Sequence, residues 1–172
     1  MSFKSDVAYE EWAHEVYQVP FLERKGVTFL ERYEPFHKFG DYRILWHDKE
    51  YNVEFKVERL PRENLALEHW SDKGNNPGWM MKSEADLLIY LVGGNSKKPR
   101  NIIMKMPKLR KWFADTVYDN PKFRGRIREP DSNEWQDNQT EFYAIPIEML
   151  EQEGLWLKSW ILKPKGKGPG PS

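Results

Sequence analysis

The sequence predicts an α/β protein in which helices flank a mixed central β-sheet. Residues 53–58 alternate apolar and charged side chains, and this period of two is typical of a half-buried strand. Residues 86–92 form a nearly continuous apolar run that ends at a Gly-Gly pair, as expected of a strand buried on both faces. Amphipathic helical patterns occur both before and after these strands, so helices can cover both faces of the sheet.

The composition indicates one globular domain. The chain has 172 residues, of which 39% are hydrophobic and 31% are charged. We expect residues 1–162 to form this domain and the basic, Pro/Gly-rich residues 163–172 to be a disordered tail. The absence of cysteine excludes disulfides and thiolate metal sites. Because the sequence shows neither a signal-peptide pattern nor a long apolar run, we expect a cytoplasmic protein without membrane contact.

The first half of the chain predicts one helix and three strands. Ser5 or Asp6 can cap a helix that Pro20 ends near Val19, because proline lacks the N–H that a helix interior needs. A short strand over 27–30 precedes a loop. Strands over 41–47 and 51–58 follow, joined by a turn at residues 47–50.

The second half alternates strands, turns and helices. A strand over 64–70 ends at the turn sequence of residues 71–77. The buried strand 86–92 comes next, and Pro107 opens a helix that runs to residue 120. After a polar loop at 129–139, we expect a last core strand over 140–147 and a short helix ending near Gly154.

Three charged residues of the two adjacent strands form a candidate catalytic site. Glu54 and Lys56 share one strand face, and a hairpin places Asp41 beside them. Two carboxylates are the hard oxygen ligands that suit Mg²⁺, and a neighbouring lysine can orient or deprotonate an attacking water. The alternative is an ordinary solvated strand face with surface salt bridges.

The charge distribution also favours a phosphate ligand. Residues 97–128 carry 11 basic and 2 acidic residues, although the whole chain has a formal net charge of zero. The alternative is a solvated helix with long basic side chains. The candidate phosphate contacts are Lys105, Lys108, Arg110, Lys111, Lys122, Arg124, Arg126 and Arg128.

Several motifs resemble those of the PD-(D/E)XK (restriction-endonuclease-like) nuclease superfamily, in particular its small phage-type and junction-resolvase-like members. The resemblance covers roughly residues 5–150, with Gly40 standing where the signature has proline. The matching stretches are Asp41…Glu54-x-Lys56, Leu65-Ala66-Leu67-Glu68, residues 78–90 (GWMMKSEADLLIY), residues 106–110 (MPKLR) and residues 143–147 (YAIPI).

The resemblance implies roles for the candidate residues. Asp41 and Glu54 would be metal ligands, and Lys56 would contact the attacking water or steady the charge of the pentavalent phosphorus. Glu68 would complete the metal shell. Alternatively, it is a surface glutamate paired with Lys56 or Arg59. Glu10, or Glu15 on the same helix, would reach the site as a further ligand. The implied cofactor is Mg²⁺, for which Mn²⁺ would substitute.

The resemblance also implies a function. We expect a Mg²⁺-dependent DNA endonuclease, working as a homodimer in phage or host recombination and repair, with branched DNA such as Holliday junctions among its candidate substrates. The main alternative is a catalytically silent nucleic-acid-binding module of the same fold. A third hypothesis is a non-nuclease α/β protein whose Asp41, Glu54 and Lys56 form a surface salt-bridge cluster.

Overall fold

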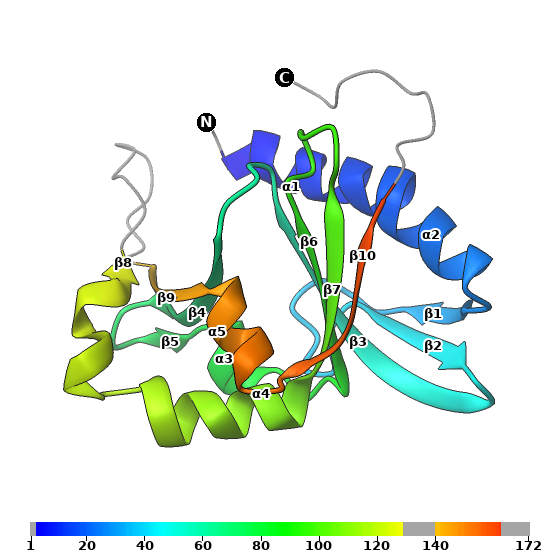
Figure 1. Cartoon of the computed structure of the whole chain (residues 1–172). Coiled ribbons are helices and arrows are strands. Elements are labelled where there is room, and N and C mark those ends of the chain that lie inside the picture. The colour runs from blue at the N-terminus through cyan, green and yellow to red at the C-terminus, as the bar shows by residue number, and fades with distance from the viewer. Residues whose placement is uncertain (1–2, 129–139, 163–172) are drawn as a thin grey trace.

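The structure, a computed structural model, describes residues 3–128 and 140–162 and confirms the predicted α/β class (Figure 1). Along the chain, helical segments alternate with strands, and the strands form two β-sheets. The helices are α1 (Phe3–Ala13), α2 (Val19–Arg24), α3 (Trp79–Lys82), α4 (Met106–Trp112) and α5 (Ile147–Gln152). Two π-helical turns and one 3₁₀ helix extend them: η1 (His14–Gln18), η2 (Phe113–Val117) and η3 (Pro121–Arg126).

The larger sheet has six strands, in the order β1-β2-β3-β6-β7-β10. Its strands are β1 (Thr28–Arg32), β2 (Tyr42–Trp46), β3 (Lys49–Glu58), β6 (Leu87–Val92), β7 (Arg100–Lys105) and β10 (Trp156–Ile161). Strand β3 runs parallel to β6, whereas the other neighbours pair antiparallel. His47 and Asp48 join β2 to β3, and both have positive φ, as a two-residue type I′ hairpin turn requires.

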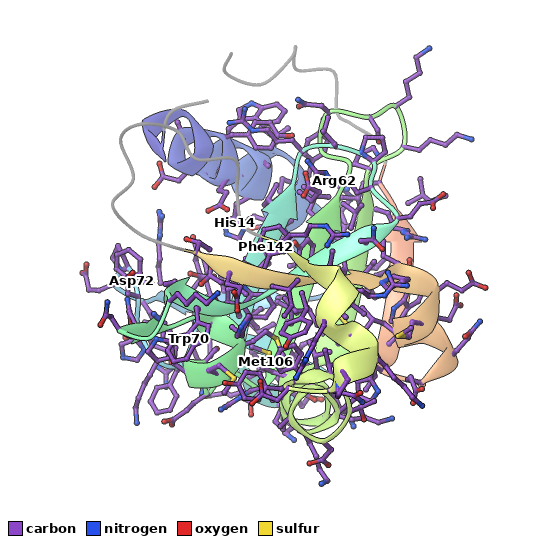
Figure 2. All side chains as sticks on the ribbon, turned by 90° about the vertical axis from the view of Figure 1, so that its left-hand side faces the viewer. His14, Arg62, Trp70, Asp72, Met106 and Phe142 are labelled. Carbon is purple, nitrogen blue, oxygen red and sulfur yellow. The ribbon has the colours of Figure 1, made fainter. Side chains whose placement is uncertain are left out.

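A smaller antiparallel sheet lies beside the first, in the order β5-β4-β9-β8. Its strands are β4 (Asn64–Asp72), β5 (Asn76–Pro77), β8 (Ile127–Arg128) and β9 (Glu141–Pro146). The sheet lies between α1 and the α4–η2 segment, as two perpendicular views show (Figures 1 and 2).

Two hydrophobic cores enclose the large sheet. One core packs α1, η1 and α2 against the sheet face that contains Val53, Phe55 and Ile89. The other core joins the opposite face to the small sheet and to α4, through side chains such as Leu88, Leu67 and Leu109. Strand β6 is buried along its whole length, which confirms the expectation of a central strand covered on both sides.

Pro20 does not end the first helix, contrary to the expectation. The chain passes through the π-helical turn η1 and continues as α2, with Pro20 in the first turn of α2. The N–H of Val19 makes a π-helical bond to the His14 carbonyl, so the helix changes its hydrogen-bond register directly before Pro20, the residue that lacks an N–H.

The expectation that all the strands belong to one sheet was wrong. The predicted strands over 64–70 and 140–147 pair with each other in the second sheet, and do not extend the central one. Strand β7, which pairs with β6, was not expected at all. The predicted loop 129–139 and tail 163–172 lie outside the described residues. No helix in the described part of the chain is both long and apolar enough to cross a bilayer.

Candidate functional site

The β2–β3 hairpin brings Asp41 to the middle of β3. The backbone N–H of Asp41 donates to the carbonyl oxygen of Val53 over 2.7 Å. The Asp41 carboxylate in turn accepts a hydrogen bond from the backbone N–H of Phe55, also over 2.7 Å. One carboxylate oxygen of Asp41 is therefore held against the strand that carries Glu54 and Lys56.

Gly40 is required for this approach, and proline could not replace it. Its φ is +94°, whereas the ring of proline fixes φ near −65°. A Cβ atom at this position would lie 2.5 Å from the carbonyl oxygen of Val53. The absence of proline before Asp41 therefore has a local geometric cause.

Glu54 and Lys56 form a close ion pair on one face of β3. The Lys56 Nζ atom lies 2.7 Å from Glu54 Oε1, and Glu54 is only 7% exposed. The Ser83 hydroxyl donates to the other carboxylate oxygen, Oε2, over 3.1 Å. The Lys56 ammonium also lies 5.7 Å from the ring centre of Trp79, within the range of a cation–π contact.

Burial and mutual charge set the protonation of the three residues. Burial raises the pKa of Asp41 and the nearby Glu54 carboxylate raises it further, while Lys56 and the Phe55 N–H oppose the rise. For Lys56, burial lowers the pKa, but the combined attraction of Glu54 and Asp41 outweighs it and the net pKa is raised. Lys56 is therefore an ammonium ion at neutral pH.

Glu10 and Glu68 are placed differently. The Glu10 carboxylate, on α1, contributes to the raised pKa of Lys56, so its field reaches the cluster. The Glu15 carboxylate instead contributes to the raised pKa of Tyr42. Glu68 lies in the second sheet, where its carboxylate accepts a hydrogen bond of 2.7 Å from Ser71.

The site offers two neighbouring carboxylates, those of Asp41 and Glu54, and not a complete set of metal ligands. Among the described residues, no group of three His, Asp or Glu side chains could hold a metal ion by itself. The structure thus unites Asp41, Glu54 and Lys56, adds the charge of Glu10, and does not add Glu68 to the same group. The roles of Glu10 and Glu68 as ligands stay predictions.

Four of the eight predicted phosphate contacts have partners within the chain. Lys111 forms an ion pair of 2.6 Å with Asp115, and Lys108 donates to the Gly154 carbonyl over 2.8 Å. Arg128 donates to carbonyls of its own turn. Both terminal nitrogens of Arg110 donate to carbonyls, those of Ser83 and Met81. The other four lie on the end of β7 and on η3, three exposed and one half-buried: Lys105, Lys122, Arg124 and Arg126.

Ser83 and Trp79 contact Glu54 and Lys56 but were not among the predicted site residues, although both lie in the matching stretch 78–90. The only sequence signal was their position just before the buried strand β6. Register makes the connection possible, because Glu54 pairs with Leu88 and Lys56 pairs with Tyr90 on neighbouring strands. The segment that enters β6 therefore passes the same sheet face.

Comparisons with models of protein families, with curated proteins and with solved structures returned no match.

Proposed function

We propose that this protein is a Mg²⁺-dependent endonuclease that hydrolyses phosphodiester bonds in DNA. The observation that carries the proposal is the meeting of Asp41, Glu54 and Lys56 at one point of the central sheet. Keeping two carboxylates close together in a buried place is costly, and the raised pKa of Asp41 reflects this cost. A bound divalent cation would offset this cost, because it attracts both carboxylates.

The donor set fits Mg²⁺. This ion prefers oxygen ligands, keeps several waters and often binds through one or two carboxylates plus substrate phosphates. Asp41 uses one carboxylate oxygen for the Phe55 N–H, and Glu54 offers a second carboxylate beside it. When bound, Mg²⁺ supplies Lewis-acid polarisation of the phosphate and lowers the pKa of water.

Lys56 then acts as a fixed positive charge. An ammonium ion can donate hydrogen bonds to the attacking water and to a phosphate oxygen, but it cannot accept a proton. Its raised pKa therefore favours orientation of the nucleophile and stabilisation of the charge that develops on phosphorus, rather than removal of the proton by Lys56. Asp41 and Glu54 hold this ammonium in place.

One observation favours the alternative of a catalytically silent nucleic-acid-binding module. Both oxygens of Glu54 already have protein partners, Lys56 and Ser83, so the cluster is hydrogen-bonded without a cation. Carboxylate oxygens have further lone pairs, and for this reason the contacts do not exclude a ligand role.

The test is cleavage of labelled linear duplex, single-stranded, flap and four-way-junction DNA, with Mg²⁺ or with EDTA. We expect cutting that needs Mg²⁺ or Mn²⁺ and that Lys56→Ala abolishes. Lys49→Ala, at the exposed start of the same strand, is the matched control and should cut normally. Preference for the junction, and a dimer in sedimentation, would support the expected structure-selective enzyme. Binding without cutting would support the silent module.

A further inference from the structure

Arg110 joins α4 to the segment that enters strand β6. Its Nη1 atom donates to the Ser83 carbonyl over 2.6 Å, and its Nη2 atom donates to the Met81 carbonyl over 2.7 Å. These carbonyls lie at the C-terminal end of the short helix α3, where backbone acceptors lack helical partners. The planar fork of arginine can bridge two acceptors, which the single ammonium of lysine cannot do with the same geometry.

Ser83 connects this anchor to the candidate site. It is 3% exposed, and its hydroxyl donates to Glu54 Oε2 over 3.1 Å. Its backbone N–H also donates to the Trp79 carbonyl over 3.0 Å. Ser83 therefore links Arg110 on α4 to the buried Glu54 carboxylate on β3 through two hydrogen bonds.

The segment around Ser83 is fixed on its other side as well. The N–H of Glu84 donates to the Lys38 carbonyl over 2.6 Å, close to Asp41 in the chain. The N–H of Asp86 donates to the Asn52 carbonyl over 2.8 Å, and the Asp86 carboxylate accepts from the Asn52 N–H. Residues 83–86 therefore touch both the loop before Asp41 and the strand of Glu54.

We propose that Arg110 and Ser83 are positioning residues that orient the Glu54 carboxylate for a divalent cation. The inference rests on the proposed function. It assigns Arg110 a different role from the phosphate contact that the sequence predicted, because both terminal nitrogens of its guanidinium are used inside the protein. Hydrogen bonds to a ligating carboxylate typically affect metal affinity by about 10- to 100-fold.

Calorimetric titration with Mn²⁺, in the absence of DNA, measures this role directly. We expect Arg110→Lys and Ser83→Ala to weaken Mn²⁺ binding by about 10-fold or more. Ser83→Thr keeps a hydroxyl and should restore most of the affinity. Lys82→Gln is the control, since Lys82 is an exposed residue of α3 and neighbours Ser83 in the chain.

A second measurement separates positioning from DNA contact. In EDTA, the affinity of Arg110→Gln and Ser83→Ala for a short duplex should equal that of the native chain. Should Arg110→Gln lose DNA affinity while Mn²⁺ affinity stays native, Arg110 is a phosphate contact and the inference is wrong. If Arg110→Lys does not fold, as circular dichroism would show, the Ser83→Ala and Ser83→Thr pair decides alone.

The same titration distinguishes failure of the inference from failure of the proposed function. A native chain that binds no Mn²⁺ and cuts no DNA would overturn both. A native chain that binds Mn²⁺, with Ser83→Ala and Arg110→Lys binding it equally well, would overturn only the positioning role.

Discussion

The Asp41 carboxylate is hydrogen-bonded, over 2.7 Å, to the backbone N–H of Phe55, the residue that separates Glu54 from Lys56. The contact spans 14 residues of sequence and fixes the first carboxylate of the candidate site against the strand that carries the second. Because the donor is a backbone group, no substitution at Phe55 other than proline removes it.

Asp41→Asn should separate function from stability. The amide oxygen of asparagine can still accept from the Phe55 N–H, while the buried negative charge near Glu54 disappears. Since burial raises the pKa of Asp41, we expect a Tm no lower than that of the native chain, together with a loss of cleavage on the order of 100-fold or more.

Differential scanning calorimetry and the cleavage assay check this prediction together. Glu50→Gln, on the exposed start of β3, serves as a control that should cut normally. A Tm lowered by more than about 3 °C, or about 1 kcal/mol for a chain of this size, would show instead that the attraction of Lys56 dominates at Asp41.

Gly40→Ala should destabilise the fold through two effects. The alanine would have to adopt a φ of +94°, and its Cβ atom would lie 2.5 Å from the Val53 carbonyl oxygen. We expect a loss of about 2 kcal/mol or more in the free energy of unfolding. Gly26→Ala separates the two effects, because Gly26 has a φ of +78° and no atom within 4 Å of an added Cβ.

Urea unfolding of both variants gives the comparison. Gly26→Ala should cost about 1 kcal/mol, the cost of the left-handed backbone alone. Equal losses for the two variants would mean that the Val53 carbonyl moves aside without cost.

His14 should make the protein less stable in acid. Burial lowers its pKa from the ordinary 6.5 to about 4, although the hydrogen bond with Gln18 opposes this shift. The unfolded chain then binds the proton more readily than the folded chain, so stability is complete above pH 6.5 and declines as the pH falls to about 4. His69, whose pKa is also lowered by burial, acts in the same direction.

Between pH 6.5 and about pH 4, the protonation of His14 should lower the free energy of unfolding by about 2 to 3 kcal/mol. His14→Phe keeps a ring that can pack against Phe55 and Tyr42 and does not titrate. Unfolding free energies measured from pH 7 to pH 4 should fall less steeply for this variant than for the native chain.

DNA binding should weaken with salt in proportion to the phosphates contacted. With about five contacts, a plot of log affinity against log salt has a slope near −4 to −5. The double variant Lys122→Gln/Arg124→Gln removes two exposed charges of η3 and should make the slope shallower by about 2. Fluorescence anisotropy in EDTA measures the slope. Lys49→Gln, in the β2–β3 hairpin, is the control and should leave the slope unchanged. An unchanged slope would place the DNA elsewhere.

The part of the candidate site that the sequence could predict is local. Alternation along one strand places Glu54 and Lys56 on one face, and the short turn at His47 and Asp48 makes Asp41 their neighbour. Ser83 and Arg110 escaped prediction as partners of this site because their hydrogen bonds span 27 to 29 residues and depend on how whole elements dock.

The sheets show the same limit. The periodicity of β4 and β9 indicates strands but not which strands they pair with, so their separate sheet could not be read from it. Strand β7 lacks a clean alternation because it is buried on both faces except at its ends. At Pro20, the π-helical turn η1 overrode a strong local stop signal.

The contacts of residues 83–86 have a consequence for the motions of the protein. This segment is hydrogen-bonded to the loop before Asp41, to β3 and to α4, and Met106 at the start of α4 bonds back to Asp86. Opening any one of these contacts exposes amides of the others, so the amides of Glu84, Asp86 and Met106 should exchange with solvent deuterium at a common rate. A cation that holds Asp41 and Glu54 would slow that rate for all three amides, including that of Met106 in a different element.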